Sequence, residues 1–348
     1  MAYMASGMMA RPEKILGLVL AGGQGLRMQP LTQDQAKPAL PVGGCFRLVD
    51  FVLSNLINSG IECIYLLAQY KPESLIEHIY TNWRLTAVDE GHFISVVLPR
   101  REQGGYFHGT ADAVYQNLAL IEQHAPDLVA VFAADHIYRM DVRQMAYFHR
   151  ECDADVTVAA TQVPIEQASS FGIIAAGYRG EIFDIQQAPE APIAIPACPD
   201  RAYASMGDYL FSTDVLVEAL EQALRVGETD FGVHILPRLL SSHHVHAYDL
   251  SSNCIPGIRA HEEPSYWRDI GTMEEYISAH QDICGNAPRF NLHNPHWPIQ
   301  PLLCAQQSAF DMGYVQAVSL MNGSDMAVQY PISSVFSAEC DARQIGSA

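Results

Sequence analysis

Three glycines and two cations form the stretch of this 348-residue chain that is best suited to chemistry. They follow a short apolar run that predicts a buried strand, and they are Gly22, Gly23, Gly25, Arg27 and Lys37. Glycines let the backbone turn sharply and leave its amide groups uncovered, so that the N–H groups can form a concave site for an anion. A glycine-rich turn followed by arginine and lysine therefore predicts a polyphosphate site.

Two known phosphate loops do not fit this turn. The dinucleotide fingerprint needs a third glycine where this chain has Met28, and the Walker A loop needs a Gly-Lys-Ser/Thr ending that the turn lacks. Taken alone, the turn leaves an ordinary strand-to-loop connection open.

A carboxylate at the end of a strongly apolar run is the second candidate. The run Leu128–Ala133 predicts a buried strand, and Asp135 follows it. Open α/β sheets bind ligands at the carboxyl ends of their strands, which makes this acid a candidate ligand contact. A helix cap is the ordinary interpretation of an aspartate at such a place.

Small residues at 109–113 open a predicted helix that continues through Ile121. Gly109 and Thr110 would let a ligand approach closely, and free N–H groups at the start of the helix would face it. A glycine that serves only the packing of the helix start remains the other interpretation.

Apolar strands alternate with amphipathic helices across the first half of the chain, which predicts a parallel sheet with helices on both faces. Besides 15–20 and 128–133, strands are expected at 64–68, 93–98, 155–164 and 244–250. Helices are expected from residue 48 to a stop at Gly60, from Pro72 onward, over Thr213–Val226, and from a capping box at Thr272 and Glu275 to Ile283.

The composition excludes several classes of protein. The hydrophobic fraction of 49% predicts a packed globular core, and the net charge of −19 argues against a general nucleic-acid binder. The eight cysteines are scattered without a C-x-x-C pair, which predicts reduced thiols in a cytoplasmic protein and no zinc site. The sequence has no apolar run of about 18 residues, so that no membrane span is expected. Residues 1–14 are expected to be a disordered lead-in rather than a signal peptide.

The motifs together carry more information than any one of them. AGG-x-G-x-R is followed by Lys-Pro ten residues later, and then by GTADA, ADHIY, PIEQASSFG, ASMG, DFG and YWRD-x-GT. In this order they resemble bacterial ADP-glucose pyrophosphorylases (glucose-1-phosphate adenylyltransferases), within the sugar-1-phosphate nucleotidyltransferases. The resemblance runs from residue 15 to 299 and implies a Rossmann-like, GT-A-like α/β fold with a mixed, mainly parallel sheet. It also implies a catalytic domain at 15–288 and a linker with a truncated left-handed β-helix at 289–348.

The resemblance also implies roles for single residues. The expected catalytic residues are Arg27, Lys37 and Asp135, and a Mg²⁺ ion would be held by Asp135 and Asp269. The expected nucleotide contacts are Ala21, Gly22, Gly23, Gly25, Gln69, Gly109 and Thr110. The expected sugar-phosphate contacts are Gln187, Ser205, Asp230, Phe231 and Trp267.

The sequence departs from the family at the sugar phosphate. Gln187 and Ala188 stand where the family has a glutamate that holds the sugar hydroxyls and a lysine that pairs with the phosphate. Glutamine still forms hydrogen bonds, but alanine offers the phosphate nothing. Losing one charge-assisted contact costs on the order of 1.5–3 kcal/mol, roughly ten- to a hundredfold in binding. Gln33, Asp34 and Gln35 also stand where the family usually has a basic pair that helps to bind anionic activators, which predicts weak or absent activation by sugar phosphates.

Two functions follow from the resemblance. The first is Mg²⁺-dependent transfer of AMP from ATP to glucose 1-phosphate, giving ADP-glucose and pyrophosphate for glycogen or another α-glucan, with weakened sugar-phosphate binding. The second is a catalytically impaired regulatory subunit that binds ligand and modulates an active paralogue. We expect a homo-oligomer or a hetero-oligomer with such a paralogue, and neither nucleic acid nor a membrane as a partner.

Overall fold

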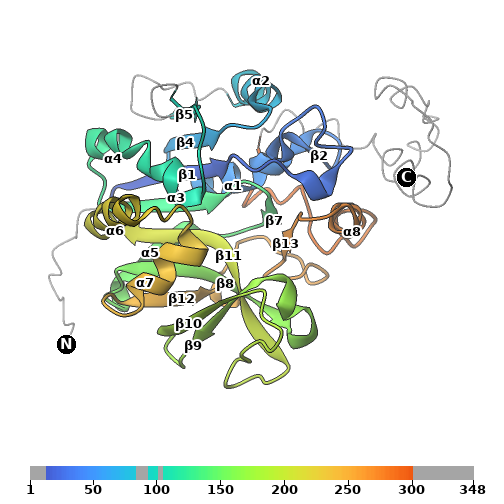
Figure 1. Ribbon diagram of the computed structural model, residues 1–348. Helices are drawn as coiled ribbons and strands as arrows, with labels where there is room; N and C mark the ends of the chain where they lie inside the picture. The colour runs from blue at the N-terminus through green and yellow to red at the C-terminus, as the bar shows by residue number, and fades with distance from the viewer. Residues whose placement is uncertain (1–12, 84–92, 101–104, 301–348) are drawn as a thin grey trace, which may run out of the picture.

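A nine-stranded mixed sheet forms the centre of the molecule, as a computed structural model of residues 13–83, 93–100 and 105–300 shows (Figure 1). The parallel half consists of β1 (Ile15–Ala21), β4 (Cys63–Ala68), β5 (Phe93–Val97) and β6 (Leu128–Ala133). The long strand β11 (Arg201–Ser212) runs antiparallel to β6 and joins this half to the rest of the sheet. That remainder is β8 (Val156–Pro164), β9 (Gly172–Ala176), β10 (Ile182–Gln187) and β12 (Val245–Asp249). The expected mixed α/β sheet is thus confirmed.

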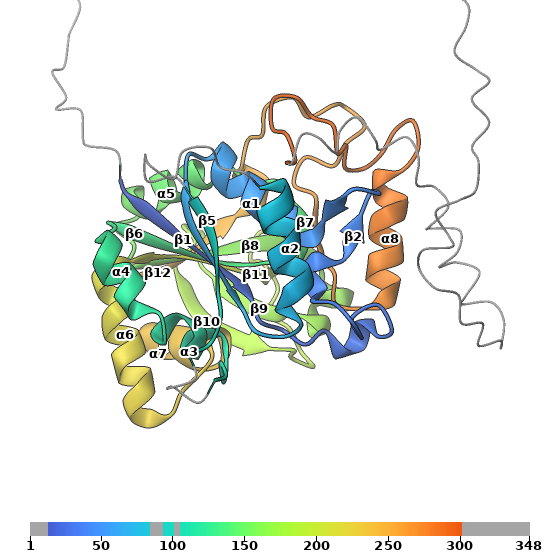
Figure 2. The same cartoon turned by 90° about the horizontal axis from the view of Figure 1, so that it is seen from above.

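Helices cover both faces of the sheet, which Figure 2 shows from above. One face packs against α3 (Thr110–Tyr115), α4 (Leu118–His124), α6 (Thr213–Val226) and α7 (Leu236–Leu239). The other packs against α1 (Leu48–Asn58), α2 (Pro72–Asn82) and α5 (Val142–Glu151). The continuous apolar runs of β1 and β6 are explained by this arrangement, because strands that are covered on both faces have no solvent side.

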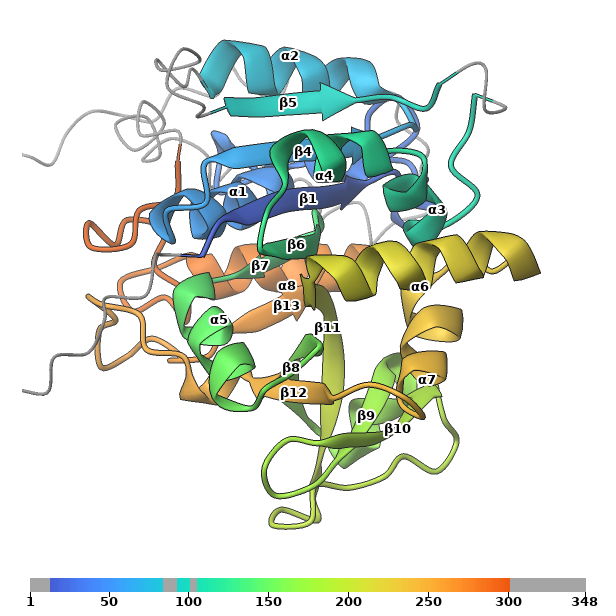
Figure 3. The same cartoon turned by 90° about the vertical axis from the view of Figure 1, so that its left-hand side faces the viewer.

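The two edges of the sheet lie far apart, with β5 beside α2 at one end and β9 and β10 at the other (Figure 3). At the far end the sheet curls. Ala247 N–H donates to the carbonyl of Gly180 at 2.7 Å, and Glu181 bridges to His246, so that β12 returns to the hairpin of β9 and β10. Residues of β9 and β10 at this end also line a small cavity.

A third apolar cluster holds the remaining elements beside the sheet. It packs α8 (Met273–Ile283) against two short ribbons, β2 (Pro41–Val42) with β3 (Phe46–Arg47) and β7 (His136–Tyr138) with β13 (Trp267–Asp269). Thr272 caps α8 by accepting the amide of Glu275 at 3.3 Å. In a full capping box the Glu275 carboxylate would also accept the backbone N–H of Thr272. Here that carboxylate pairs with Arg268 at 2.5 Å instead.

One expected helix is divided in two. The chain leaves helical geometry at Asn117, so that α3 ends at Tyr115 and α4 begins at Leu118. The Asn117 side chain donates to the carbonyl of Ala113 at 2.8 Å and thereby competes with helix propagation. The other strands and helices expected from the sequence lie within about two residues of their predicted bounds.

The segment after α8 returns to the body of the molecule. Trp297 Nε1 donates to Asn55 Oδ1 at 3.0 Å, and Gln300 N–H donates to Ser54 Oγ at 2.8 Å, so that this segment is tied to α1. The predicted lead-in, except for residues 13 and 14, and residues 301–348 of the predicted linker and truncated β-helix lie outside the described residues. Among the residues that are described, no helix combines the length and the apolar character that crossing a membrane would require.

Candidate active site

The predicted site residues gather where the parallel strands end. The register pairs Ala21 of β1 with Ala68 of β4, and the adjacent Leu20 with Ala133 of β6. The loops that follow these three strands therefore meet at one edge of the sheet, which is where open α/β sheets bind ligands.

Lys37 and two carboxylates form the centre of the site. Lys37 Nζ lies 2.6 Å from Asp135 Oδ2 and 3.9 Å from Asp269 Oδ1. Asp135 follows β6, whereas Asp269 ends β13, whose pairing with β7 places Asp269 opposite His136. The lysine is buried, while each carboxylate side chain keeps 31% of its surface exposed. Both acids can therefore reach a ligand that enters from solvent.

The glycine loop folds back onto this lysine. Gly25 has φ +62°, and a β-carbon there would lie 3.0 Å from Thr32 Cγ2 and 3.2 Å from Lys37 Cβ. The Thr32 hydroxyl donates to the carbonyl of Gly25 at 2.8 Å. Gly25 is thus required both by its left-handed backbone and by the close approach of the segment that carries Lys37.

His136 and Trp267 line the two carboxylates. His136 Nε2 lies 3.6 Å from Asp135 Oδ1 and 3.7 Å from Asp269 Oδ1. The His136 and Trp267 rings are 5.1 Å apart between centroids, and Trp267 also contacts Phe171 edge-on at 5.7 Å. Burial raises the pKa of Asp135, but Lys37 and His136 outweigh it and hold that pKa below its usual value. Asp135 is therefore an anion at neutral pH.

The donor set fits a magnesium ion that also takes ligands from the substrate. Among the described residues, no three His, Cys, Asp or Glu side chains are grouped closely enough to enclose a metal ion. Mg²⁺ is commonly held by one or two carboxylates and completes its octahedron with waters and substrate phosphates. Asp135 and Asp269 supply hard oxygen ligands of this kind.

Gln69 links the glycine loop to the segment before α3. Its amide nitrogen lies within 3.3 Å of the carbonyl oxygens of Gly22 and Phe107, and its oxygen accepts the Phe107 N–H at 2.8 Å. A β-carbon on Gly23 would meet nothing within 4 Å. Gln69 therefore holds the loop at Gly22, while the space next to Gly23 stays free, as a phosphate site requires.

Arg27 lies at the entrance of a large cavity. It is exposed, and within the described part of the chain it makes no ion pair. The cavity has a volume of about 840 Å³, and its lining includes Arg27, Phe171, Trp267 and Asp269. Arg27 thus keeps its guanidinium available for a phosphate beside the carboxylates.

The start of α3 is not the open anion site that the sequence suggested. The amides of Ala111 and Asp112 donate to the carbonyl of Thr229 at 2.9 and 3.3 Å, so that the expectation of free N–H groups is wrong for these two residues. A β-carbon on Gly109 would lie 2.3 Å from the same oxygen. Gly109 therefore admits the backbone of Thr229, as the packing interpretation expects, and its contact with the nucleotide stays a prediction.

Thr110 and Asp230 hold each other in place. The Thr110 hydroxyl donates to Asp230 Oδ2 at 2.9 Å and accepts the Phe231 N–H at 3.0 Å. Asp230 Oδ1 also accepts the Val233 N–H at 2.9 Å and caps the short helix that follows. Both side chains nevertheless line a second cavity, of about 210 Å³, within the curled end of the sheet.

This smaller cavity also holds the sugar-phosphate candidates Gln187 and Ser205. Gln187 Nε2 donates to the carbonyl of Gly232 at 3.0 Å. Among the described residues, the lining contains Asp230 but no lysine, arginine or histidine. Ala188 next to it has φ +44°, a left-handed conformation that is unusual for alanine. The cavity therefore lacks a cation of its own for a phosphate.

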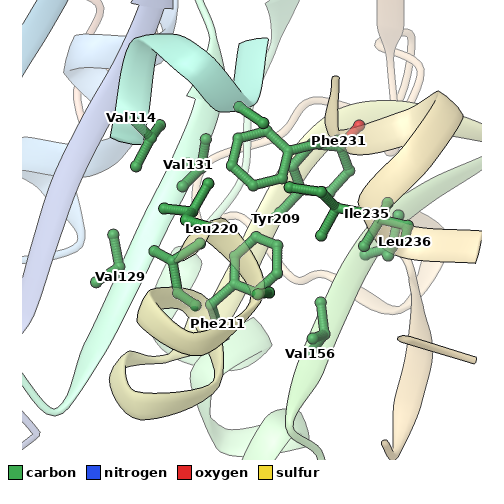
Figure 4. Close-up of a cluster of buried hydrophobic side chains, with 14 of the residues drawn as sticks. Val114, Val129, Val131, Val156, Tyr209, Phe211, Leu220, Phe231, Ile235 and Leu236 are labelled. Atoms are coloured by element: carbon green, nitrogen blue, oxygen red, sulfur yellow. The ribbon is translucent and has the colours of Figure 1, made fainter. Parts of the chain in front are cut away.

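Phe231 does not reach this cavity with its side chain. Its ring is fully buried and lies 5.7 Å from Tyr209 and 5.5 Å from Phe211, in the core beneath α6 (Figure 4). The aromatic ring fills the core, so that only the backbone of Phe231 is left for a contact with the sugar phosphate, and that contact stays a prediction.

The sequence reasoning missed one acid near the site. Asp208 is fully buried at the centre of β11, and its Oδ1 accepts the amide of Ala133 at 2.9 Å. The available signal was an acidic residue within an otherwise apolar strand, directly after Ala-Ser-Met-Gly. An acid is seldom buried without a partner, so that such a position indicates a specific role.

Comparison with known proteins agrees with this geometry. The family model described as nucleotidyl transferase matches residues 16–286. The glucose-1-phosphate adenylyltransferase of Thermodesulfovibrio yellowstonii is 51% identical over 290 residues, which are 83% of this chain and 71% of that protein. The Thermus thermophilus protein of the same name is 47% identical over 296 residues, covering 82% and 71%. Glucose-1-phosphate adenylyltransferase 1 of Vibrio cholerae is 42% identical over 288 residues, covering 82% and 70%. The chain therefore belongs to the nucleotidyl transferase family of enzymes.

Proposed function

We propose that this chain transfers AMP from ATP to glucose 1-phosphate, forming ADP-glucose and pyrophosphate. The observation that carries the proposal is the convergence of Lys37, Asp135 and Asp269 at the end of the sheet, beside the glycine loop. The relatives are named for this reaction, and they match the chain over four fifths of its length. The ADP-glucose so formed would serve synthesis of glycogen or another α-glucan.

The reaction needs positioning more than acid–base chemistry. A phosphate oxygen of glucose 1-phosphate attacks the α-phosphorus of ATP, and the bond to pyrophosphate breaks on the opposite side. The attacking oxygen is already anionic, so that no side chain has to remove a proton. The protein has to align the reactants and neutralise the charge that develops on the phosphates.

Each site residue has a part in this alignment. The glycine loop would hold the triphosphate with its amides, and Arg27 would contact the β- and γ-phosphates in a bidentate manner. Lys37 would place its charge at the α-phosphate. Asp135 and Asp269 would hold Mg²⁺, which supplies charge neutralisation on the α-phosphate and the departing pyrophosphate when bound.

The sugar would lie between Trp267 and the smaller cavity. Ser205, Gln187 and Asp230 offer hydrogen bonds for hydroxyl groups there. Because no cation lines this cavity, Lys37 and the metal ion would carry most of the attraction for the sugar phosphate. We therefore propose an active enzyme with a high KM for glucose 1-phosphate, in the cytoplasm, as a homo-oligomer or paired with a paralogue.

The test is release of pyrophosphate by the purified chain with ATP, glucose 1-phosphate and Mg²⁺. Asp135→Asn is the matched control, since it keeps the size of the side chain and removes its charge. Release that disappears in Asp135→Asn supports the proposal. Absence of release at millimolar sugar phosphate, from a folded chain that binds ATP, would contradict it.

The second candidate function is a regulatory subunit with impaired catalysis. It is favoured by one observation, the absence of a cation from the lining of the sugar cavity. In that case the chain would bind ATP but would change the rate of an active paralogue rather than turn over itself. Mixing it with such a paralogue and measuring the rate against added chain would distinguish the two functions.

A further inference from the structure

A buried carboxyl group, that of Asp208, contacts the end of the strand that leads to Asp135. The pairing of β11 with β8 shifts register between Ser205 and Tyr209, which leaves a bulge at 206–208. Gly207 has φ +73°, a conformation that glycine adopts without strain. The bulge directs Asp208 toward the end of β6, where Oδ1 accepts the N–H of Ala133 at 2.9 Å. β-Bulges often redirect a side chain next to an active site.

Three polar atoms around this carboxyl group are buried and have no hydrogen-bond partner of good geometry among the described residues. They are Asp208 Oδ2, Tyr138 Oη and His136 Nδ1. Tyr138 and His136 both belong to β7, which begins three residues after Ala133 ends β6. Buried polar groups are nearly always satisfied, so that a group of three such atoms beside a carboxyl group is a feature that packing alone does not explain.

The electrostatics agree that these groups interact. Burial raises the pKa of Asp208 to about 6. His136, the Ala133 amide and the Tyr138 hydroxyl lower this pKa, because they favour the charged carboxylate, but burial outweighs them. Asp135 adds a repulsion that acts in the same direction as burial. The charge state of Asp208 thus depends on both His136 and the site carboxylate Asp135.

His136 connects this network to the site. Its Nε2 lies 3.6 Å from Asp135 Oδ1 and 3.7 Å from Asp269 Oδ1, while its Nδ1 is the buried atom without a partner. Ala133, whose amide Asp208 holds, is two residues before Asp135. Asp208 therefore holds the backbone two residues before Asp135, and its charge acts on the ring that lies against both acids.

We propose that Asp208 is a positioning residue, which fixes the end of β6 and the ring of His136 and thereby sets the placement of Asp135 and Asp269. The inference rests on the proposed function, because those two acids are its metal-binding carboxylates. A simple packing role does not explain the residue, since a leucine would fill the same space in an apolar strand without a buried acid. Misplacement of reacting groups by about 1 Å can cost about a hundredfold in rate.

The test compares Asp208→Leu with Asp208→Asn in the full chain. Leucine fills the space but accepts no hydrogen bond, whereas asparagine keeps an oxygen for the Ala133 amide. We expect Asp208→Leu to lower kcat by about 10- to 100-fold with KM for glucose 1-phosphate changed less than threefold. Asp208→Asn should recover a large part of that loss. Binding of Mn²⁺ with ATP, measured by calorimetry, should weaken in the same order.

A second buried acid outside the site provides the matched control. Glu262 is 5% exposed, pairs with Arg139 at 3.2 Å and accepts the amides of Arg259 and Asn291. Glu262→Gln should lower the melting temperature and leave kcat within twofold of wild type. If Asp208→Leu is folded and keeps kcat and Mn²⁺–ATP affinity within twofold, the proposal is overturned. It is also overturned if kcat in both Asp208 variants falls only in proportion to melting temperature, as in the control.

The two proposals fail in different ways. An inactive wild-type chain would contradict the proposed function, and the calorimetric ranking of the Asp208 variants would still decide the positioning role. Should Asp208→Leu not fold, Asp208→Asn decides: unchanged kcat and Mn²⁺–ATP affinity would overturn the proposal, and a lower kcat at an unchanged melting temperature would support it.

Discussion

Lys37 Nζ lies 2.6 Å from Asp135 Oδ2, which places the buried cation of one loop against the acid that follows the central strand β6. The same Nζ is 3.9 Å from Asp269 Oδ1. One ammonium group thus faces both carboxylates. In the proposed reaction this cation is shared between the acids and the phosphates, and its position decides how strongly the triphosphate is held.

Replacing Lys37 with methionine keeps the length of the side chain and removes its charge. A charge-assisted contact contributes about 1.5–3 kcal/mol, so that kcat/KM for pyrophosphate release should fall roughly ten- to a hundredfold. Lys71→Met is the control, because Lys71 is an exposed lysine at the start of α2. Equal activities of the two variants would show that Lys37 only balances the charge of Asp135.

Gly109→Ala tests the corrected role of the segment before α3. The added β-carbon would lie 2.3 Å from the carbonyl oxygen of Thr229, so that one of the two segments must shift. Overpacking of this kind destabilises by roughly 1–3 kcal/mol, which urea unfolding can measure. Gly23→Ala is the control, since a β-carbon there meets nothing within 4 Å. A Gly109→Ala protein as stable as wild type would mean that the Thr229 carbonyl yields at little cost.

The general architecture could be predicted because its signals are local. The apolar runs of β1 and β6 and the spacing of α1 and α6 each lie within a few turns of chain. The pairing of β13 with β7 could not be predicted in this way. It joins Asp269 to His136 across 133 residues, and only long-range packing decides it.

The roles of single site residues show the same limit. The sequence alone pointed to a polyphosphate at the glycine loop and to a ligand contact at Asp135. It could not show that Phe231 turns into the core, because an aromatic residue after aspartate suits a cavity wall and a core equally well. It also could not show that Thr229 fills the start of α3, since a backbone carbonyl leaves no trace in the sequence.

Ala188→Lys should restore the charge that the sugar cavity lacks. Ala188 already adopts φ +44°, so that a longer side chain with the same β-carbon adds little backbone strain. A new charge-assisted contact of about 1.5–3 kcal/mol should lower KM for glucose 1-phosphate roughly ten- to a hundredfold. Ala188→Met has similar length without charge and should leave KM near the wild-type value. The same KM in both variants would show that position 188 does not face the phosphate.

His149 should make the stability of the chain depend on pH. The residue is 3% exposed, and its ring nitrogens contact Thr157 Oγ1 at 2.8 Å and Ser212 Oγ at 3.3 Å. Burial lowers its pKa to about 4, with Asp155 acting in the opposite direction and His246 in the same one. The unfolded chain, with an ordinary histidine pKa near 6.5, therefore binds the proton more readily than the folded one. The stabilisation from neutral His149 is complete above about pH 6.5 and is lost as pH falls toward 4, by roughly 3 kcal/mol in all.

The effect has to be measured as a difference between variants, because Asp208 works against it in part of the same range. The raised pKa of Asp208 makes the folded chain the better proton binder between about pH 4 and 6, so that its contribution grows as pH falls. His149→Gln removes only the contribution of His149 to the pH dependence of the unfolding free energy. The urea-unfolding free energy of this variant should therefore decline less steeply than that of wild type from pH 6.5 to 4. His261→Gln, at an exposed position, should leave the slope unchanged. Parallel curves for wild type and His149→Gln would mean that His149 takes up its proton in the folded chain without penalty.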